Sequence, residues 1–485
     1  PKARYTIYCN IFFYSEKWDP KNYKMDYDEN RPFFDQMHEL LIKVPKINTY
    51  LSLGAGPNIN SDYANMAGGC KNCYLVFNTS PAEELMYSRG ITNVRDSSDL
   101  YFSRESERCY ESVNVEQSSG ILFSKNVVGS VDGAFLLNCR GVMNCFGCVN
   151  LNNKSYYFLN QPLPQDEYKK KVDEIMGSYE KIQEFKKIFE KFSLGFPMRE
   201  NNNMKSVNSR GDYLFECKNV IDSFEIPKGE NCRYLYSSKD LKDSMDTIGY
   251  GTKSEKLLGV VGVGFSSNVI GSYGAENCSD VLYSFYITNC KDCIGCDGLK
   301  NSKYFILNKE YSKEEYERLS QKIIKELEDK NLHGLMMPME MAPFAYNESI
   351  AQDNIPLTKE EALAQGYRWE DDVQKTEGKG TIDMQNLPDN IKDVGDQMLS
   401  EVLSCVECNR NYKITAQELL FYRKINIPLP HKCFYCRHRD RLLRRGPYKF
   451  WDRSCAKCNK DIYTNYAPDR PEIVYCEKCY QQEVY

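Results

Sequence analysis

The stretch Asp292–Tyr316, DCIGCDGLKNSKYFILNKEYSKEEY, has a near copy earlier in the chain. The earlier stretch, Asn144–Tyr168, reads NCFGCVNLNNKSYYFLNQPLPQDEY, and a constant offset of 148 residues aligns the two without a gap. Ten of the 25 aligned positions are identical. A gapless match of this length indicates an internal duplication. We therefore expect two similar halves, each of which runs into a helix.

A shorter unit recurs inside each half. It has a small residue at each end and an apolar residue in the middle, as in SKNVVGS at Ser124, CKNVIDS at Cys217 and CKDCIGC at Cys290. Short apolar runs such as YLF and YFIL interleave with these units. Short strands with polar turns and small stacked residues are typical of a β-solenoid, in which each coil covers the next. The units are unevenly spaced, so the sequence does not assign one unit to one coil.

Three cysteines, Cys290, Cys293 and Cys296, fall at every third position in the later copy. The earlier copy has Val142 where Cys290 would match, and valine cannot bind a metal. Buried cysteine packs as a small hydrophobic residue. We therefore favour inward packing for this triplet and for the CKNC pair that begins at Cys70. A metal or cluster site and a redox centre are the other two interpretations.

The last part of the chain carries four C-x-x-C pairs within 75 residues: CVEC, CFYC, CAKC and CEKC. A C-x-x-C turn directs two thiolates toward one point, so two turns complete the tetrahedral four-sulfur site that zinc prefers. Pairing the turns in sequence order predicts two structural zinc ions, whereas nested or crossed pairs would have to interleave more tightly. The alternative to zinc binding is that these thiols pack in the interior or oxidise. The predicted ligands are Cys405, Cys408, Cys433 and Cys436 for one ion and Cys455, Cys458, Cys476 and Cys479 for the other.

The same part of the chain is basic. From Cys405 to Tyr485 it holds 16 Lys and Arg against 9 Asp and Glu, a formal charge of +7, although the whole chain carries −5. Arginine with interleaved aromatic residues can grip phosphates and stack on bases. The alternative is a solvated loop whose arginines offset the charge of the zinc–thiolate sites. The candidate residues for binding nucleic acid or another partner are Arg437, Arg439, Arg441, Arg444, Arg445, Lys449, Trp451 and Arg453.

These patterns together predict the fold class and the domains. We expect a mainly β protein with a duplicated parallel β-solenoid (β-helix-like), an amphipathic helix after each copy and a C-terminal tandem zinc-ribbon module. The helices are predicted at 165–192 and 312–330, and the second begins with a capping box. The expected domains are an N-terminal segment, two solenoid copies, a linker with short helices and the double zinc ribbon, at residues 1–60, 61–200, 201–340, 341–400 and 401–485. A last linker helix is predicted at 391–403.

Composition excludes some classes of protein. The longest apolar run, LLGVVGVGF at Leu257–Phe265, is far shorter than the ~20 residues of a membrane span. No secretory signal opens the chain, and many of the 21 cysteines occur as C-x-x-C pairs, which indicates a reducing compartment. We therefore expect a cytoplasmic protein without membrane contact. The 4 histidines argue against histidine-based catalysis.

The segment CVECNRNYKITAQELLFYRKINIPLPHKCFYCRHRDRL resembles the "probable zinc-ribbon" family. The resemblance lies in the C-x-x-C pairs and in Glu418 before the aromatic pair Phe421 and Tyr422. The wider chain resembles proteins of candidate-phyla (Patescibacteria-type) bacteria that combine such ribbons with a cysteine-rich repeat. The resemblance implies zinc and this architecture, and it implies no activity.

The first residues, PKARYTIYCNIFFY, resemble the later PEIVYCEKCY. Cys9 matches Cys476, but Phe12 stands where Cys479 would be. The chain is therefore expected to begin inside the remnant of another zinc ribbon, unless the similarity is that of two unrelated β-strands.

Three classes of function remain. We favour a non-enzymatic zinc-binding scaffold that binds a macromolecular partner, nucleic acid or protein, through the basic zinc module. The first alternative is a structural solenoid protein that forms homo-oligomers, because exposed solenoid ends invite association. The second is a β-helix enzyme that acts on a polymer. Acidic pairs such as Asp240 and Asp243 occur, but they lie in repeat units, and no nucleophile motif or open metal triad accompanies them.

Overall fold

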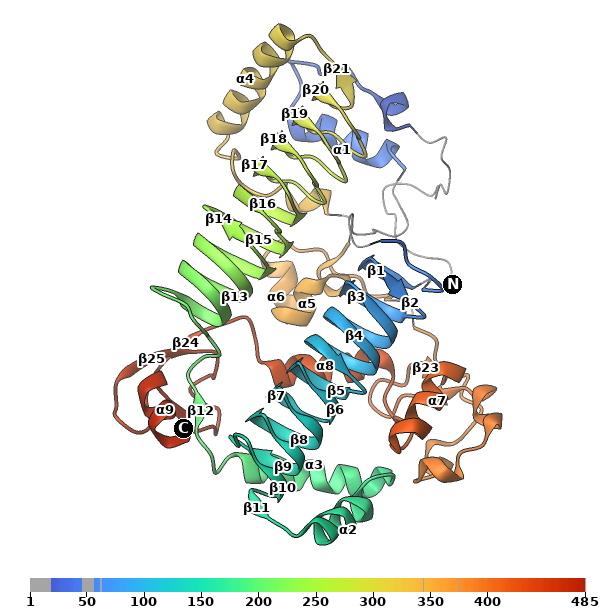
Figure 1. Cartoon of the computed structure of the whole chain (residues 1–485). Helices are drawn as coiled ribbons and strands as arrows, with labels where there is room; N and C mark the ends of the chain where they lie inside the picture. The colour runs from blue at the N-terminus through green and yellow to red at the C-terminus, as the bar shows by residue number, and fades with distance from the viewer. Residues whose placement is uncertain (1–18, 46–55, 62, 343, 374, 485) are drawn as a thin grey trace.

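The computed structural model describes residues 19–45, 56–61, 63–342, 344–373 and 375–484. Regular structure in these residues is mainly β, as the sequence predicts, with one 11-stranded sheet, one 9-stranded sheet and three two-stranded sheets. We call the two large sheets sheet 1 and sheet 2. Figure 1 shows them as two stacks of strands side by side. The expected zinc-ribbon remnant at residues 1–18 lies outside the described residues.

The two large sheets follow one another along the chain. Sheet 1 contains β1 (Ala64–Ala67), β2 (Cys70–Lys71), β3 (Tyr74–Thr79), β4 (Ala82–Glu107), β5 (Tyr110–Glu116), β6 (Ser119–Leu122), β7 (Lys125–Val128), β8 (Val131–Arg140), β9 (Met143–Val149), β10 (Ser155–Phe158) and β11 (Gln161–Pro162). Sheet 2 contains β13 (Arg210–Ser238), β14 (Leu241–Lys242), β15 (Met245–Tyr250), β16 (Ser254–Val263), β17 (Ser267–Ile270), β18 (Ser279–Leu282), β19 (Lys291–Ile294), β20 (Lys303–Ile306) and β21 (Lys309–Glu310).

Neighbouring strands in both sheets pair in parallel, and paired residues are 12 positions apart. In sheet 1 Val131 pairs with Met143, and in sheet 2 Lys291 pairs with Lys303. A single extra residue enters at β15–β16, where Met245 pairs with Leu258. Each large sheet ends in a short antiparallel hairpin, β10–β11 or β20–β21. The unevenly spaced units of the sequence therefore belong to a regular 12-residue repeat.

The chain turns at every third residue along the repeats. These residues have positive φ, as in the consecutive series Asn277, Asp280, Tyr283, Tyr286 and Asn289. Left-handed backbone costs least for glycine, asparagine and aspartate, which explains why these residue types fill many of the turns. Four turns fall in each 12-residue repeat. The residue after each turn faces inward and is buried, as are Cys278, Val281, Ser284, Ile287 and Cys290.

Inward serines link successive repeats by hydrogen bonds. Ser124 donates its hydroxyl to the carbonyl of Leu122 at 2.7 Å and accepts the backbone N–H of Leu136, 12 residues later, at 2.9 Å. Outside, asparagines at the turns form matching ladders, in which Asn277 donates to Asn289 and Asn289 to Asn301, at 2.7 and 3.0 Å. Polar groups on both sides of the backbone thus find partners one repeat away, which fixes the register.

The inward cysteines pack in the same positions as the serines. Cys290, Cys293 and Cys296 are at most 2% exposed, and each thiol lies 3.3–3.4 Å from the carbonyl oxygen two residues before it. Within the described residues, they form no group with metal-ligand spacing. This is the placement that the packing interpretation predicts. Cys70 and Cys73 are buried in sheet 1 in the same way.

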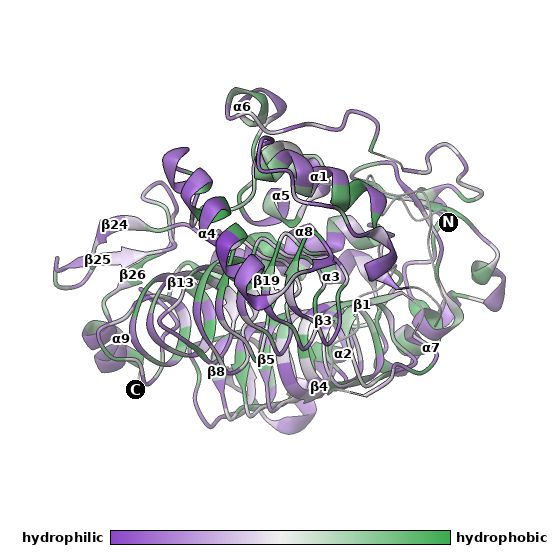
Figure 2. Cartoon of the chain, turned by 90° about the horizontal axis from the view of Figure 1, so that it is seen from above, coloured by the Kyte–Doolittle hydropathy of each residue, from purple (hydrophilic) through white to green (hydrophobic). Residues whose placement is uncertain are grey.

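Helices cover the ends and outer faces of the sheets. They are α1 (Phe33–Lys43), α2 (Gln165–Ile175), α3 (Tyr179–Ser193), α4 (Lys313–Asp329), α5 (Ile350–Asn354), α6 (Lys359–Ala364), α7 (Ala416–Ile425), α8 (Phe434–Arg445) and α9 (Glu477–Val484). The apolar side of α4 packs with α1 on sheet 2, and that of α3 packs on sheet 1. Figure 2 shows the hydrophilic colouring of the outer side of α4.

Two helix predictions need correction. The segment 165–192, expected as one helix, forms α2 and α3, because Gly177 between them has φ +92° and interrupts the helix. The helix expected at 391–403 is absent; this segment forms two 3₁₀ turns, Ile391–Asp393 and Asp396–Leu399, followed by β22 (Leu403–Ser404). The remaining 3₁₀ turns are Pro20–Tyr23, Met339–Met341, Tyr346–Glu348 and Met384–Asn386.

The two duplicated ends share one hydrogen-bonding device. In sheet 2, Asn308 accepts the N–H of Asp297 at 2.8 Å and donates to the carbonyl of the same residue at 2.9 Å. In sheet 1, Asn160 makes the same pair of bonds to Val149, at 2.9 and 3.0 Å. The amide closes the last repeat before the terminal hairpin, so each copy carries the same end cap.

Replacing Asn308 by alanine is expected to lower the free energy of unfolding by about 2–4 kcal/mol, because two buried backbone groups lose their partner. Urea denaturation followed by circular dichroism measures this loss. Asn301→Ala is the matched control, since Asn301 is an exposed member of the outer ladder, and we expect less than about 1 kcal/mol for it. Equal losses for the two variants would contradict the capping role of Asn308.

Candidate metal centres

The first cysteine group lies between a hairpin and a helix. β22 and β23 (Asn411–Tyr412) are antiparallel, and the turn between them carries Cys405 and Cys408. Cys433 is the N-cap of α8, and Cys436 lies in the first turn of that helix. The four Sγ atoms all lie within 4.8 Å of one another.

The second group repeats this plan. Cys455 and Cys458 lie between the antiparallel strands β24 (Trp451–Ser454) and β25 (Asp461–Thr464), while Cys476 and Cys479 lie at the start of α9. Their Sγ atoms also lie within 4.8 Å of one another. An asparagine closes each hairpin turn. The N–H of Asn409 donates to the backbone carbonyl of Cys405, and the N–H of Asn459 donates to that of Cys455, each at 2.9 Å. The first two C-x-x-C pairs thus form one group and the last two form the other, which is the pairing in sequence order.

The spacing of the sulfur atoms fits a shared tetrahedral cation. The Sγ atoms of Cys408 and Cys433 are 3.7 Å apart, and those of Cys458 and Cys476 are 3.8 Å apart. A tetrahedron with zinc–sulfur bonds of about 2.3 Å has edges of about 3.8 Å. A disulfide requires about 2.05 Å. Both groups can therefore hold a metal ion with all four positions filled by protein, which is typical of structural sites.

Helix α8 carries the first site into contact with sheet 1. Arg437 donates through Nε to both carboxylate oxygens of Asp99 in β4, at 3.1 and 3.2 Å. One turn further along the helix, Arg441 donates to Asp99 at 2.5 Å and to the carbonyl of Tyr87 at 3.0 Å. Asp99 and Arg441 are 0% exposed. Two arginines and one carboxylate therefore meet in a site without solvent, a few residues from the cysteine ligands.

The charges of this buried site are balanced by a second carboxylate. Glu418 in α7 lies 3.5 Å from Arg437 and accepts the hydroxyl protons of Tyr87 at 2.7 Å and of Tyr422 at 2.8 Å. Burial raises the pKa of Glu418. Burial would also raise the pKa of Asp99, but Arg437 and Arg441 outweigh it and hold that pKa below its usual value. Asp99 is thus the charged anchor for the arginines of α8.

The end of α8 and the loop after it connect sheet 1 to sheet 2. Arg445 donates to the hydroxyl of Tyr101 in β4 at 2.9 Å. The next loop brings Tyr448, which donates its hydroxyl to Glu225 in β13 at 2.7 Å, and Tyr101 lies 3.3 Å from the same carboxylate. Glu225 is buried. One network of hydrogen bonds therefore contains both sheets and the module, and Figure 1 shows α8 where the two stacks approach each other.

The second cysteine group contacts the junction between the sheets. β12 (Met198–Arg199), in the segment that connects sheet 1 to sheet 2, pairs in parallel with β26 (Val474–Tyr475). Arg199 forms an ion pair with Glu477 of α9, and Tyr480 donates to Asn150 of sheet 1 at 2.9 Å. Asn465 donates to the buried Asp212 of β13 at 2.8 Å. The module thus contacts both sheets at this end as well.

The basic residues predicted to bind a partner divide into two sets. Arg437, Arg441 and Arg445 are buried and paired inside the chain, so they cannot reach an external phosphate. This removes them from the predicted binding surface. The other five lie nearer the surface with intramolecular partners: Arg439 with Glu407, Arg444 with Glu111, Lys449 over the ring of Trp451, and Arg453 with the carbonyls of Ala467 and Glu472.

No sequence pattern identifies most partners of these arginines. A family resemblance points to Glu418, but Asp99, Tyr101 and Glu225 lie more than 200 residues before α8 and carry no motif. The one available signal was the residue type, since Asp99 stands at a turn position where aspartate is common for conformational reasons alone. Only the fold distinguishes this aspartate from the others.

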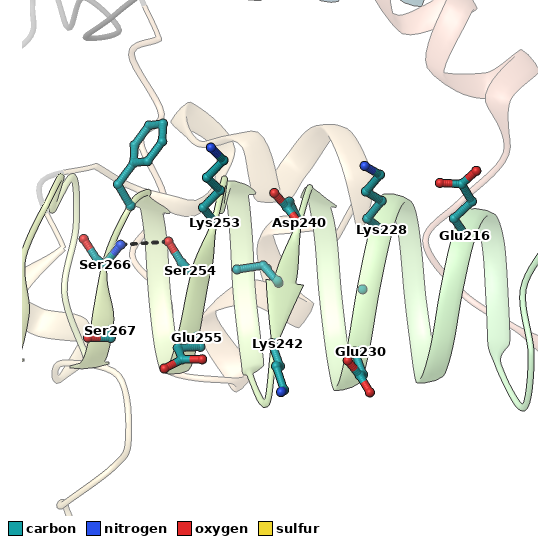
Figure 3. Close-up of a pocket in the computed structure, with 13 residues that line it drawn as sticks. Glu216, Lys228, Glu230, Asp240, Lys242, Lys253, Ser254, Glu255, Ser266 and Ser267 are labelled. Carbon is teal, nitrogen blue, oxygen red and sulfur yellow. Dashed lines mark hydrogen bonds between the residues drawn. The ribbon is translucent and has the colours of Figure 1, made fainter.

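A hollow runs along the outside of β13, β14 and β16, and it does not bring catalytic groups together. Figure 3 shows two rows of charged side chains that point to opposite sides of the strands. One row alternates Glu216, Lys228, Asp240 and Lys253; the other alternates Glu230, Lys242 and Glu255. Asp240 and Asp243 occupy different turns of one repeat. Alternating charges along a strand ladder stabilise neighbouring repeats.

The comparisons with known proteins supply no family. No family model matches the chain, and no curated protein matches it. Among solved structures, it is similar to a protein from Desulfovibrio desulfuricans G20 assigned as an acetyltransferase, with 11% identity and a TM-score of 0.12. The match covers 52% of this chain and 65% of that protein, slightly less than two thirds of its length. A similarity of this size carries no argument about fold or function.

No helix among the described residues is both long and apolar enough to cross a bilayer.

Proposed function

We propose that this chain is a non-enzymatic scaffold in which two structural zinc ions hold a C-terminal module against a pair of parallel β-solenoids. Support for the solenoid architecture comes from parallel pairing at a step of 12 residues in both large sheets. Support for zinc comes from two closed sets of four thiols with sulfur–sulfur distances of 3.7 and 3.8 Å. The cytoplasm, where thiols stay reduced, is the compartment that such sites favour.

The observation that carries this proposal is the position of α8. Two ligands of the first site, Cys433 and Cys436, lie at the start of the helix, and Arg437 and Arg441 are one and five residues beyond the second ligand. A metal at the cysteines fixes the start of α8, and the arginines then fix the helix to sheet 1. Closed four-thiolate sites contribute folding free energy and leave no coordination position for a substrate.

The chemistry at the module favours a protein partner over nucleic acid. Nucleic acids are bound by uncompensated positive charge, whereas Arg437, Arg441 and Arg445 are buried and Arg439 is paired with Glu407. Self-assembly is the second candidate for the scaffold, because the segment that bridges to β13 at the start of sheet 2 exposes apolar side chains, with Met204 at 38% and Val207 at 59%. The enzyme hypothesis receives no support from the hollow on sheet 2, since its carboxylates diverge.

Zinc removal is the experiment that tests the proposal. We expect two zinc ions per chain by elemental analysis. After chelation, we expect hydrogen exchange to increase at least tenfold for backbone amides of β4 and β13 near Tyr87, Tyr101 and Glu225, which α8 and the following loop cover. Amides bonded to inward serines, such as that of Leu136, serve as the internal control and should keep their protection. Unchanged exchange at β4 after metal loss, or absence of zinc, would contradict the proposal.

A further inference from the structure

Sheet 2 contains a counterpart of the surface that receives α8 in sheet 1. Before the extra residue in β15–β16 the offset between the copies is 147, so VRDSSDLY at 94–101 aligns with LKDSMDTI at 241–248. Asp246 is then the counterpart of Asp99, and Tyr234 is the counterpart of Tyr87. Both counterparts have nearly the same positive φ as the originals, and all four values lie between 52° and 57°. The duplication has therefore kept the tyrosine and the aspartate that bind Arg441 in sheet 1.

The two surfaces differ in what covers them. In sheet 1, Tyr87, Ser98 and Tyr101 are at most 5% exposed beneath α8. Their counterparts in sheet 2 are Tyr234, Met245 and Ile248, which are 37%, 39% and 40% exposed. Ser98 has thus been replaced by a larger apolar residue. Three large hydrophobic side chains around one carboxylate form the exposed patch that we call the Asp246 surface.

Asp246 has no hydrogen-bond or ion-pair partner among the described residues. Arg233, the neighbour of Tyr234 in the chain, lies with its guanidinium 5.7 Å from the centre of the Tyr234 ring, and it forms no ion pair with Asp246. Asp99 shows what such a carboxylate accepts when it is covered, namely an arginine from a helix. Apolar neighbours strengthen that contact, because a charge pair gains energy as water is excluded.

The Asp246 surface is bounded on both sides along sheet 2. On one side, the β24–β25 hairpin covers the repeat of Asp222 and Phe224, where Phe450 stacks on Phe224 at 4.5 Å. On the other side, Met336 lies beside Gly259, which holds the turn position of Asp246 one repeat later: a Cβ at Gly259 would meet the sulfur of Met336 at 3.3 Å. The ring of Tyr448 also lies 5.5 Å from that of Tyr236, and its hydroxyl lies 3.0 Å from that of Ser237, in the repeat just before Asp246. The uncovered surface is therefore narrow and is centred on the repeat of Asp246.

We propose that the Asp246 surface binds an arginine-bearing helix of a partner protein. The partner's arginine occupies the place that Arg441 takes on Asp99, and its apolar side chains cover Tyr234, Met245 and Ile248. The helix lies across the strands, because Met336 blocks the direction along the sheet that α8 follows in sheet 1. The inference rests on the proposed scaffold function and gives it a partner chemistry.

The test uses the full chain and a synthetic helix of the kind that sheet 1 already binds. The probe is a fluorescein-labelled peptide of residues 434–446 with Cys436→Ser, measured by fluorescence anisotropy at 50 mM salt. We expect saturable binding that weakens at least fivefold for Asp246→Asn and for Ile248→Lys. The matched control is Asp243→Asn, which removes the same charge three residues away at an exposed turn and should change the affinity less than twofold. A peptide with Arg441→Ala should bind at least fivefold more weakly.

The outcomes separate this inference from the scaffold proposal. Equal weakening by Asp246→Asn and Asp243→Asn would show only general charge attraction and would overturn the inference, as would the absence of binding at 1 mM peptide. Self-association of the chain that Asp246→Asn abolishes would assign the surface to a second copy and overturn it too. None of these results changes the zinc content or the chelation response, on which the scaffold proposal depends. Hydrogen exchange confined to 233–248 on peptide addition would support the site.

Discussion

Replacing Asp99 by asparagine is expected to lower the free energy of unfolding by about 3–5 kcal/mol. Asp99 is fully buried and is the shared acceptor of Arg437 and Arg441, which are themselves buried. Asparagine keeps the shape but leaves two cations facing one weak acceptor without solvent. Breaking a buried ion pair on one side costs more than the pair contributes, because the remaining charge stays uncompensated. Urea denaturation measured by circular dichroism gives the change.

The chain supplies its own control for this experiment. Asp246 occupies the matching turn of sheet 2 with φ 53°, compared with 57° at Asp99, and it is exposed without an arginine. Asp246→Asn tests the backbone preference of the turn alone and should change the free energy of unfolding by less than about 0.5 kcal/mol. Adding Arg441→Met to Asp99→Asn should restore part of the loss, since one uncompensated charge leaves with the arginine. Equal effects of the two aspartate variants would show that the buried network contributes nothing.

Local patterns in the sequence predict how the eight C-terminal cysteines group. A C-x-x-C turn places its two thiols by short-range geometry, so Cys405 and Cys408 point together whatever the rest of the chain does. To pair two consecutive C-x-x-C turns, the chain then has only to place the start of a helix beside the preceding hairpin. The matching end of each copy followed from the duplication, because Asn160 and Asn308 make the same hydrogen bonds. The mainly β class followed from the short apolar runs between units bounded by small residues.

The repeat itself was harder to read, for a physical reason. Turns at every third residue need no single residue type, because tyrosine at Tyr283 and aspartate at Asp280 both adopt the left-handed conformation. Inward positions are also filled by anything small or apolar, from Ser284 to Ile287. The 12-residue step therefore leaves a weak pattern, and one extra residue near Tyr250 shifts it between the halves.

The arginines of α8 show the limit of reasoning from composition. A cluster of positive residues with aromatic neighbours has the same composition whether it faces solvent or a buried carboxylate. Asp99 lies 338 residues before Arg437, and its role depends on a contact that only the folded chain creates. The count of positive charges in the module is correct, but Arg437, Arg441 and Arg445 are buried against the sheets and add nothing to its surface charge.

Replacing Cys433 by serine is expected to have a larger effect than the same change at Cys476. Each variant should bind one zinc ion per chain in place of two, and each lost site removes on the order of 10 kcal/mol of metal-dependent folding free energy. The consequences differ because Cys433 caps α8, which carries Arg437 and Arg441 into sheet 1. Without the first ion, α8 should leave sheet 1, so that protease cleaves within 401–450 at least a hundredfold faster than in the native chain.

Loss of the second site should remain local. Cys476→Ser should expose residues 451–484 to protease, while the contact between Arg441 and Asp99 keeps 401–446 protected. Cys293→Ser is the matched control: Cys293 is buried like Cys433 and Cys476, but it packs between repeats of sheet 2, so the variant should retain two zinc ions. Elemental analysis and timed proteolysis with mass spectrometry separate the three variants. Zinc loss in Cys293→Ser, or equal cleavage patterns for Cys433→Ser and Cys476→Ser, would contradict a clamp that depends on the first ion. Only that ion would lie at the start of α8, whose arginines bind Asp99 in sheet 1.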